Sequence, residues 1–179
     1  MTEVSFTLFD TPIGRCSIAW GANGVVGVGL PEPTDLRAEV RMRRRWPDVR
    51  RDKPPQPLAD AITRIAALLG GEKSDLSDVE VDWSEVTEFD RSVYEVARTV
   101  PPGKTITYGE IAKQLGDPLA ARAVGQAMGN NPYPLVVPCH RVLAAGGKLG
   151  GFSATGGVET KRRILVIEGA LEPNLFDEF

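Results

Sequence analysis

Alternating apolar and polar positions in the first third of the chain predict short β-strands. Residues 4–9 alternate in this way, and the apolar runs 16–20 and 25–30 form two further candidate strands. These two runs flank residues 21–24, a Gly-Ala-Asn-Gly sequence typical of a hairpin turn. Cys16 therefore lies in a predicted strand, where we expect it to be a structural residue.

Helical spacing of apolar residues follows the strands. It predicts helices over residues 34–46 and 58–69, with a proline-rich loop between them, and residues 79–83 then alternate like an edge strand. The first helix carries a row of arginines, namely Arg37, Arg41, Arg43, Arg44 and Arg45. Such a row is usually a solvated helix face, and contact with phosphate is the alternative.

The pattern changes near residue 87, which we take as a domain boundary. Thr87 and Thr107 each open a capping-box sequence and so predict the start of a helix. Asp117, followed by Pro118, predicts the start of a further helix that runs to Met128. Two short helices joined by a tight glycine-containing turn indicate a helix-turn-helix.

The second of these helices has an unusual outer face. Val124 and Met128 form its expected core side, whereas the other side carries Ala121, Arg122, Gly125 and Gln126. A major-groove reader needs several long polar side chains, and this face offers one arginine among small residues. Such a face suits the minor groove, where an inserted side chain accompanies base extrusion. Packing of an alanine-rich helix against another helix is the alternative.

Candidate chemistry is concentrated in residues 135–142, Leu-Val-Val-Pro-Cys-His-Arg-Val. Cys139 lies beside His140, the only histidine of the chain. His140 and Arg141 are candidates to stabilise a thiolate, which is the nucleophilic form of cysteine. On a strand, adjacent side chains point to opposite faces, so we expect a water molecule rather than a direct bond between Cys139 and His140. A buried structural cysteine in an apolar strand is the alternative reading.

Composition and charge limit the classes of protein to which the chain can belong. The chain has 179 residues, 42% of them hydrophobic, with no apolar run long enough for a transmembrane helix and no signal sequence at its start. Two unpatterned cysteines favour a reducing compartment, by default the cytoplasm, and a structural zinc site lacks ligands. The net charge is −3, yet residues 101–168 hold eight basic and four acidic residues, which favours a polyanionic partner for this half alone.

These motifs, in this order, resemble the O6-alkylguanine-DNA alkyltransferases. The resemblance rests on residues 138–142, preceded by residues 131–134 and 120–125, with Tyr108 upstream and a last helix ending in Glu168-Gly169. It covers about residues 87–171. The Asp-Thr-Pro-Ile-Gly sequence at residues 10–14 is similar to the family's ribonuclease-H-like domain.

The resemblance implies an α/β (α+β) fold in three parts. Residues 1–86 form the ribonuclease-H-like domain, and residues 87–171 form a mainly helical domain with a helix-turn-helix of winged-helix type. Residues 172–179 form an acidic tail, for which the sequence indicates no function.

The resemblance also implies the catalytic roles. Cys139 accepts the alkyl group as a permanent thioether, His140 takes the thiol proton through water, and Glu168 orients His140. Asn131 structures the active-site loop, and the Tyr108 hydroxyl acts on guanine N3. A nucleophile, a base and a residue that orients the base can together generate a thiolate without a metal ion.

The remaining implied roles concern DNA. Arg122 replaces the flipped nucleotide in the base stack, and Ala121, Gly125, Gln126 and Tyr108 share the DNA-binding face. The expected base pocket comprises Pro134, Val142, Phe152 and Ser153, where Phe152 replaces a tyrosine of some relatives.

The implied function is direct reversal of DNA damage in a single turnover, by a monomer that needs no cofactor, metal, membrane or protein partner. Its partner is double-stranded DNA containing O6-alkylguanine. A non-catalytic lesion-binding relative, a helix-turn-helix regulator and a thiol hydrolase are the alternatives.

Overall fold

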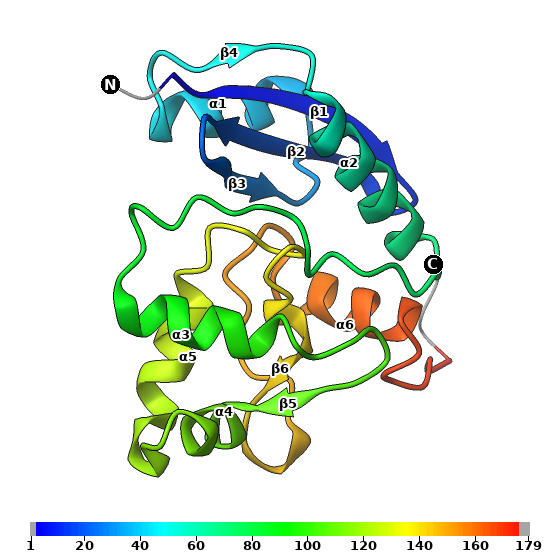
Figure 1. The fold of residues 1–179 in the computed structure, drawn as a ribbon. Coiled ribbons are helices and arrows are strands. Elements are labelled where there is room, and N and C mark those ends of the chain that lie inside the picture. The colour runs from blue at the N-terminus through cyan, green and yellow to red at the C-terminus, as the bar shows by residue number, and fades with distance from the viewer. Residues whose placement is uncertain (1–2, 176–179) are drawn as a thin grey trace.

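The computed structural model describes residues 3–175 and has a mixed α/β fold (Figure 1). Its first element is a sheet in the order β3-β2-β1-β4. The antiparallel strands β1 (Ser5–Thr11), β2 (Gly14–Gly21) and β3 (Gly24–Gly29) confirm the strands expected from the alternation over residues 4–9 and from the two apolar runs beside the hairpin turn. The short strand β4 (Arg50–Arg51), parallel to β1, was missed because it is only two residues long and lies inside the proline-rich loop.

Helices cover both faces of this sheet. Phe6, Leu8 and Ala19 pack with Ala38 and Met42 of α1 (Asp35–Arg45). The opposite face of the sheet packs against α2 (Gln56–Leu69), with Cys16 and Ile18 among the fully buried residues of that core. The strand residues therefore alternate between two apolar layers, which explains why all three strands are rich in apolar residues.

The arginine row of α1 lies at the surface, as a solvated face would. Arg41 pairs with Glu32, Arg43 with Glu39, and Arg45 with Glu85, while Arg37 and Arg44 are exposed. Exposed pairs of this kind contribute little to stability.

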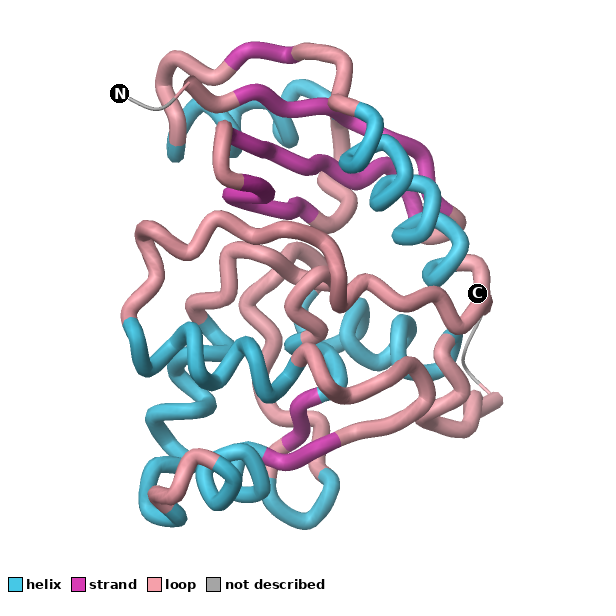
Figure 2. Tube along the Cα trace, in the orientation of Figure 1, coloured by secondary structure: helices cyan, strands magenta, loops and turns pink. Residues whose placement is uncertain are grey.

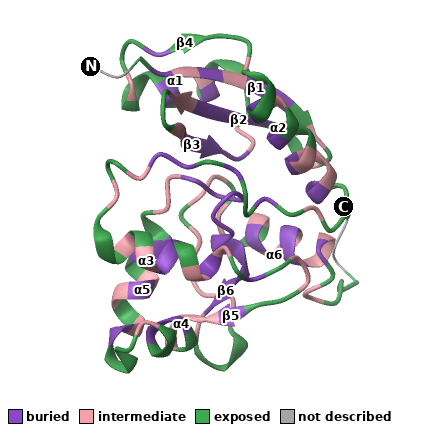
Figure 3. Cartoon of the chain, viewed as in Figure 1, coloured by how far each residue is buried: buried purple, intermediate pink, exposed green. Residues whose placement is uncertain are grey.

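The rest of the chain is mainly helix and loop (Figure 2). Its elements are α3 (Glu88–Ala97), β5 (Ile106–Thr107), α4 (Tyr108–Gln114), a 3₁₀ turn (Pro118–Ala120), α5 (Ala121–Gly129), β6 (Val142–Leu143) and α6 (Gly157–Ile167). Strands β5 and β6 form a parallel pair. Each of α3, α5 and α6 has buried residues along one side (Figure 3).

Local capping explains where these helices start. The hydroxyls of Thr87 and Thr107 accept hydrogen bonds from the amides of Asp90 and Glu110, at 3.1 Å in both cases. The Asp117 carboxylate accepts from the amide of Leu119, so the chain starts a new helix directly after the turn. The continuous helix expected from Asp117 to Met128 instead begins with the 3₁₀ turn before α5.

The linker over residues 70–87 runs between the sheet and the helices (Figure 1). The edge strand expected over residues 79–83 is wrong, because only Val81 forms a bridge, with Val25. The chain turns immediately afterwards, where the Asp82 carboxylate accepts from the amide of Ser84. No helix in the described part of the chain is long and apolar enough to cross a membrane.

Candidate active site

The segment 135–142 is not a strand, and this corrects the sequence-based expectation. Leu135 has φ of 73°, and Cys139–Arg141 form a single 3₁₀ turn before β6 begins at Val142. Pro134 and Pro138 lack the amide hydrogens that a strand ladder needs, so the segment coils despite its β-branched residues. The resulting loop directs Cys139 and His140 to different neighbours.

The Cys139 thiol lines a cavity of about 620 Å³ that opens beside α5. Its other lining residues are Tyr108, Ala121, Arg122, Gly125, Gln126, Met128, Gly129, Gly151, Phe152 and Ser153. Burial raises the pKa of the Cys139 thiol, while a hydrogen bond from Asn131 and the charge of Lys161 lower it. The second cysteine, Cys16, is fully buried in the sheet, and burial raises its pKa to about 12.

His140 is buried and bonded to a carboxylate. Its Nε2 lies 2.7 Å from Oε1 of Glu168, the residue that follows α6. Its Nδ1 is buried and forms no hydrogen bond with the described residues. Burial lowers the pKa of His140, against the opposing effect of Glu168. The imidazole is therefore neutral around pH 7, as a base must be.

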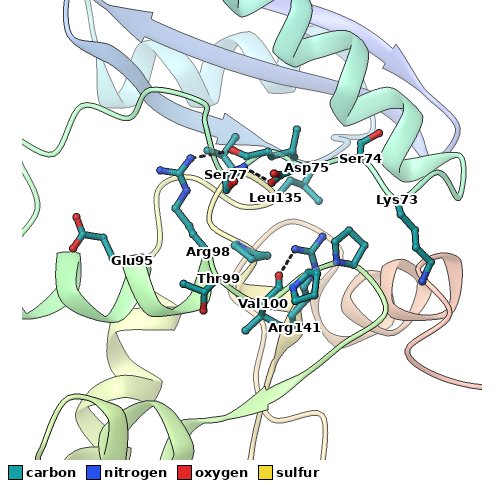
Figure 4. A pocket seen from close by; sticks show the side chains of 15 residues that line it. Lys73, Ser74, Asp75, Ser77, Glu95, Arg98, Thr99, Val100, Leu135 and Arg141 are labelled. Carbon is teal, nitrogen blue, oxygen red and sulfur yellow. Dashed lines mark hydrogen bonds between the residues drawn. The ribbon is translucent and has the colours of Figure 1, made fainter.

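Arg141 contacts Glu168 instead of the thiol, which corrects its expected role. Its Nε and Nη2 donate to the two oxygens of Glu168, each at 2.9 Å. Its Nη1 donates to the carbonyl of Val100 at 2.8 Å (Figure 4). Burial raises the pKa of Glu168, but His140 and Arg141 outweigh it and hold the value at about 2. Glu168 is thus ionised although it is almost completely buried.

Lys161 is a site residue that the sequence reading missed. It is 1% exposed, and its Nζ donates to the carbonyls of Val142 and Gly151 at 2.8 and 3.3 Å. Burial lowers its pKa to about 8, against the attraction of Cys139. Lys161, Ile164, Leu165 and Glu168 recur at helical spacing on one side of α6, a signal that the neighbouring basic residues obscured.

The outer face of α5 closes onto Tyr108. A Cβ atom added at Gly125 would lie 3.5 Å from the Tyr108 ring, and one added at Gly150 would lie 2.9 Å from the Tyr108 hydroxyl oxygen. Burial raises the pKa of Tyr108, and the charge of Cys139 adds to this effect, so the phenol stays protonated. Arg122 and Gln126 are exposed beside the cavity, whereas Val124 and Met128 are buried, and Met128 is itself among the residues that line the cavity.

The expected base-pocket residues separate into two groups. Phe152 and Ser153 line the Cys139 cavity, and the Ser153 hydroxyl donates to the carbonyl of Gly129 at 2.6 Å. Pro134 lines an adjoining cavity of about 330 Å³ that also includes Ser153. The side chain of Val142 is fully buried, and its carbonyl accepts from Lys161.

A further cavity of about 600 Å³ lies behind the segment 135–142, between the linker and α3 (Figure 4). It is lined in part by Lys73, Arg98 and Arg141, and Cys139 is not among its lining residues. Among residues 3–175, no group of His, Cys, Asp or Glu side chains is arranged to hold a metal ion.

The comparisons with known proteins agree on one family. Residues 88–170 match the family model described as the DNA-binding domain of 6-O-methylguanine DNA methyltransferase. A methylated-DNA–protein-cysteine methyltransferase of Mycolicibacterium paratuberculosis is 44% identical over 177 residues, which cover 97% of this chain and 99% of the relative. Its Mycobacterium tuberculosis counterpart is 37% identical over 178 residues, with the same coverage.

Solved structures are similar over nearly the whole chain. OGT of M. tuberculosis in complex with DNA is 34% identical, with a TM-score of 0.71 and coverage of 93% of both chains. The O6-methylguanine-DNA methyltransferase of Pyrococcus kodakaraensis is 32% identical, with a TM-score of 0.68 and coverage of 93% of this chain and 99% of that one.

Proposed function

We propose that this chain, which belongs to the methylated-DNA–protein-cysteine methyltransferase family, repairs DNA by moving the alkyl group of O6-alkylguanine onto its own Cys139. The observation that carries the proposal is a buried thiol in a cavity beside α5, next to a neutral histidine that a carboxylate holds in place. The transfer is irreversible because the product is a thioether. Each molecule therefore acts once.

The hydrogen bonds of His140 assign its tautomer. Ionised Glu168 can only accept hydrogen bonds, so Nε2 of His140 carries the proton and Nδ1 has the free lone pair. Nδ1 is then the base, and we place a water molecule between it and the Cys139 sulfur. The sulfur attacks the carbon bonded to guanine O6, a C–S bond forms, and the bond from that carbon to O6 breaks.

The leaving purine needs its developing negative charge neutralised. Tyr108 lines the same cavity as Cys139 and is protonated, so its hydroxyl can donate to guanine N3. Asn131 supports the loop that carries the thiol, with its Nδ2 donating to the carbonyl of Val137 at 3.0 Å. Phe152 and Ser153 form the wall against which the extruded base lies.

DNA binding is proposed for α4 and α5, as a helix-turn-helix whose second helix enters the minor groove. Ala121 and Gly125 allow close approach of the α5 backbone, while Arg122 is long enough to fill the gap left by the flipped base. Extruding a mispaired base costs less than extruding a paired one, which favours lesions. In this proposal residues 1–86 are a ribonuclease-H-like domain and residues 87–171 are the reactive domain.

We propose further that the protein acts as a cytoplasmic monomer on double-stranded DNA, without a cofactor or a protein partner. The two cysteines are unpaired in the structure, as a reducing compartment would keep them. The acidic tail lies partly outside the described residues, since only residues up to 175 are described.

Mass spectrometry after incubation with DNA containing O6-methylguanine tests the function. One added methyl group on the Cys139 peptide is expected, in stoichiometric amount and without turnover. An unchanged mass with tight binding would indicate a non-catalytic lesion binder, and catalytic turnover would indicate a thiol hydrolase. A helix-turn-helix regulator would bind a particular sequence regardless of the lesion.

The two cysteines supply a matched pair of variants. Cys139→Ala should bind DNA containing the lesion and transfer nothing. Cys16→Ala should retain full transfer per folded molecule, because Cys16 is buried in the sheet with its pKa raised to about 12. Loss of transfer in folded Cys16→Ala would contradict the assignment of the two thiols.

A further inference from the structure

The loop that carries the nucleophile is held through the side-chain amide of Asn131. Its Nδ2 donates to the carbonyl of Val137 at 3.0 Å, and its Oδ1 accepts from the backbone amide of Tyr133 at 2.9 Å. These two bonds fix which end of the amide carries the hydrogens. They also leave the orientation of Asn131 dependent on the position of Tyr133.

Tyr133 is anchored at the other end of its side chain. It is 2% exposed, and its hydroxyl donates to the carbonyl of Asp82 in the linker at 2.6 Å. Its ring meets those of Trp83 and Tyr94 edge-on, with centroids 5.8 and 6.5 Å apart. Burial and Asp82 raise the pKa of Tyr133 to about 12, so the phenol remains a hydrogen-bond donor throughout the working range.

The linker itself is fixed to the sheet at the residue that Tyr133 contacts. The amide of Asp82 donates to the carbonyl of Val25 in β3, and the amide of Val25 donates to the carbonyl of Glu80, each at 2.9 Å. The amide of Val28 donates to the carbonyl of Pro132, also at 2.9 Å. A continuous set of hydrogen bonds therefore joins β3, the linker and the loop over residues 131–137.

We propose that Tyr133 is a positioning residue, which holds the Asn131 amide against the Cys139 loop by tying it to the linker carbonyl of Asp82. The linker, which lies outside the Cys139 cavity, thereby adjusts the reactivity of the thiol. This proposal deepens the proposed function, and rests on it for the biological role of Cys139.

The chemical consequence follows from the effect of Asn131 on the thiol. A hydrogen bond from Asn131 favours the thiolate and lowers the pKa of Cys139 against the effect of burial. When Tyr133 loses its anchor, the Asn131 amide gains freedom and this hydrogen bond is formed for less of the time. The pKa of Cys139 then rises and a smaller fraction of the thiol is reactive at neutral pH.

The test compares Tyr133→Phe with Tyr94→Phe, a matched control. The Tyr94 hydroxyl is equally buried and donates to the carbonyl of Ala127 at 2.7 Å, but Tyr94 has no bond to Asn131. Each variant removes one buried hydroxyl hydrogen bond to a carbonyl, although the Ala127 carbonyl keeps a second donor, the amide of Asn130 at 3.2 Å. Both variants should therefore lower the melting temperature, Tyr94→Phe by less. The rate of carbamidomethylation of Cys139 by iodoacetamide is then measured from pH 6 to pH 10 by mass spectrometry of the Cys139 peptide.

Tyr133→Phe should react about three- to tenfold more slowly at pH 7.5, with its pH profile displaced to higher pH, because roughly one hydrogen bond to the thiolate is weakened. Tyr94→Phe should react at the wild-type rate. An unchanged rate in Tyr133→Phe, or an equal loss in Tyr94→Phe, would show that the hydroxyl contributes only stability.

A double-mutant cycle tests the route of the effect. If Tyr133 acts through Asn131, Tyr133→Phe should change the rate no further in an Asn131→Ala background. An additive loss in that background would overturn the proposal. Iodoacetamide requires neither DNA nor alkyl transfer, so the result stands whether or not Cys139 is the acceptor in DNA repair.

Discussion

Replacing Arg141 by methionine tests how charge is balanced in the buried relay, the set formed by Cys139, His140, Glu168 and Arg141. Methionine has a similar length and keeps the apolar contacts of the arginine stem, but it removes three hydrogen bonds, two to Glu168 and one to the carbonyl of Val100. Glu168 is 4% exposed, and among residues 3–175 its carboxylate would keep only His140 as a hydrogen-bond partner. Removing one member of a buried ion pair costs about 3–5 kcal/mol, which is a large share of the roughly 5–15 kcal/mol that stabilises a domain.

The same change should move the pH dependence of alkyl transfer. The charge of Arg141 lowers the pKa of His140, so its removal raises that pKa. A base with a higher pKa is protonated over a wider range below neutrality. The transfer rate of Arg141→Met should therefore fall as the pH is lowered from about 8 to 6, where the wild-type rate changes less.

Urea denaturation measures the first effect, and the pH profile of transfer to a free O6-alkylguanine base measures the second without a DNA-binding step. Arg141→Lys is the control, because lysine keeps the charge but lacks the two-pronged geometry. It should lose stability while its pH profile stays closer to wild type. A stability loss below about 1 kcal/mol, or an unchanged profile in Arg141→Met, would refute this account of the relay.

Two further predictions concern the DNA face and Tyr108. Arg122→Ala should slow repair of duplex DNA by roughly ten- to several-hundredfold and leave the free-base reaction unchanged, because only the duplex requires base extrusion. Arg122→Lys should recover little, whereas a phosphate contact would be rescued by lysine and would depend steeply on salt. Gly150→Ala should slow transfer about tenfold, since its Cβ would lie 2.9 Å from the Tyr108 hydroxyl oxygen. Gly147→Ala has a similar positive φ with no atom within 4 Å, so an equal loss there would mean that backbone strain, not Tyr108, is responsible.

Features determined by neighbouring residues could be predicted from the sequence. Thr87, Thr107 and Asp117 start helices through bonds to amides two or three residues away, so their positions were correct within a turn. The strands of the first third followed from alternation over residues 4–9 and from two apolar runs on either side of a hairpin turn. The arginine row of α1 lies at the surface, where its charges stay solvated and pair with exposed or partly exposed acidic residues on α1 and outside it.

Features determined by contacts between residues far apart in the chain could not be predicted from the sequence. The segment 135–142 has strand-forming residues, but Pro134, Pro138 and the positive φ of Leu135 redirect it. Lys161 can be buried because its Nζ donates hydrogen bonds to the carbonyls of Val142 and Gly151. A lysine within a basic run of the sequence gives no indication that it is buried. The expectation of a water link between Cys139 and His140 came from strand geometry, which is wrong for this segment. The structure nevertheless leaves Nδ1 of His140 free of protein partners among the described residues.

In the proposed mechanism, the charges around His140 give Arg141 a part beside Cys139, His140 and Glu168. With His140 neutral, the charges of ionised Glu168 and Arg141 cancel, so these three residues together carry no net charge. Without Arg141 the pKa of His140 would rise, and the imidazole would be protonated, and so unable to act as a base, over more of the pH range. When the thiol proton does reach His140, the new positive charge arises together with a negative thiolate, which Lys161 also stabilises. Proton transfer therefore separates charge within the site without adding any, which is the only kind of ionisation that such a buried site can support at modest cost.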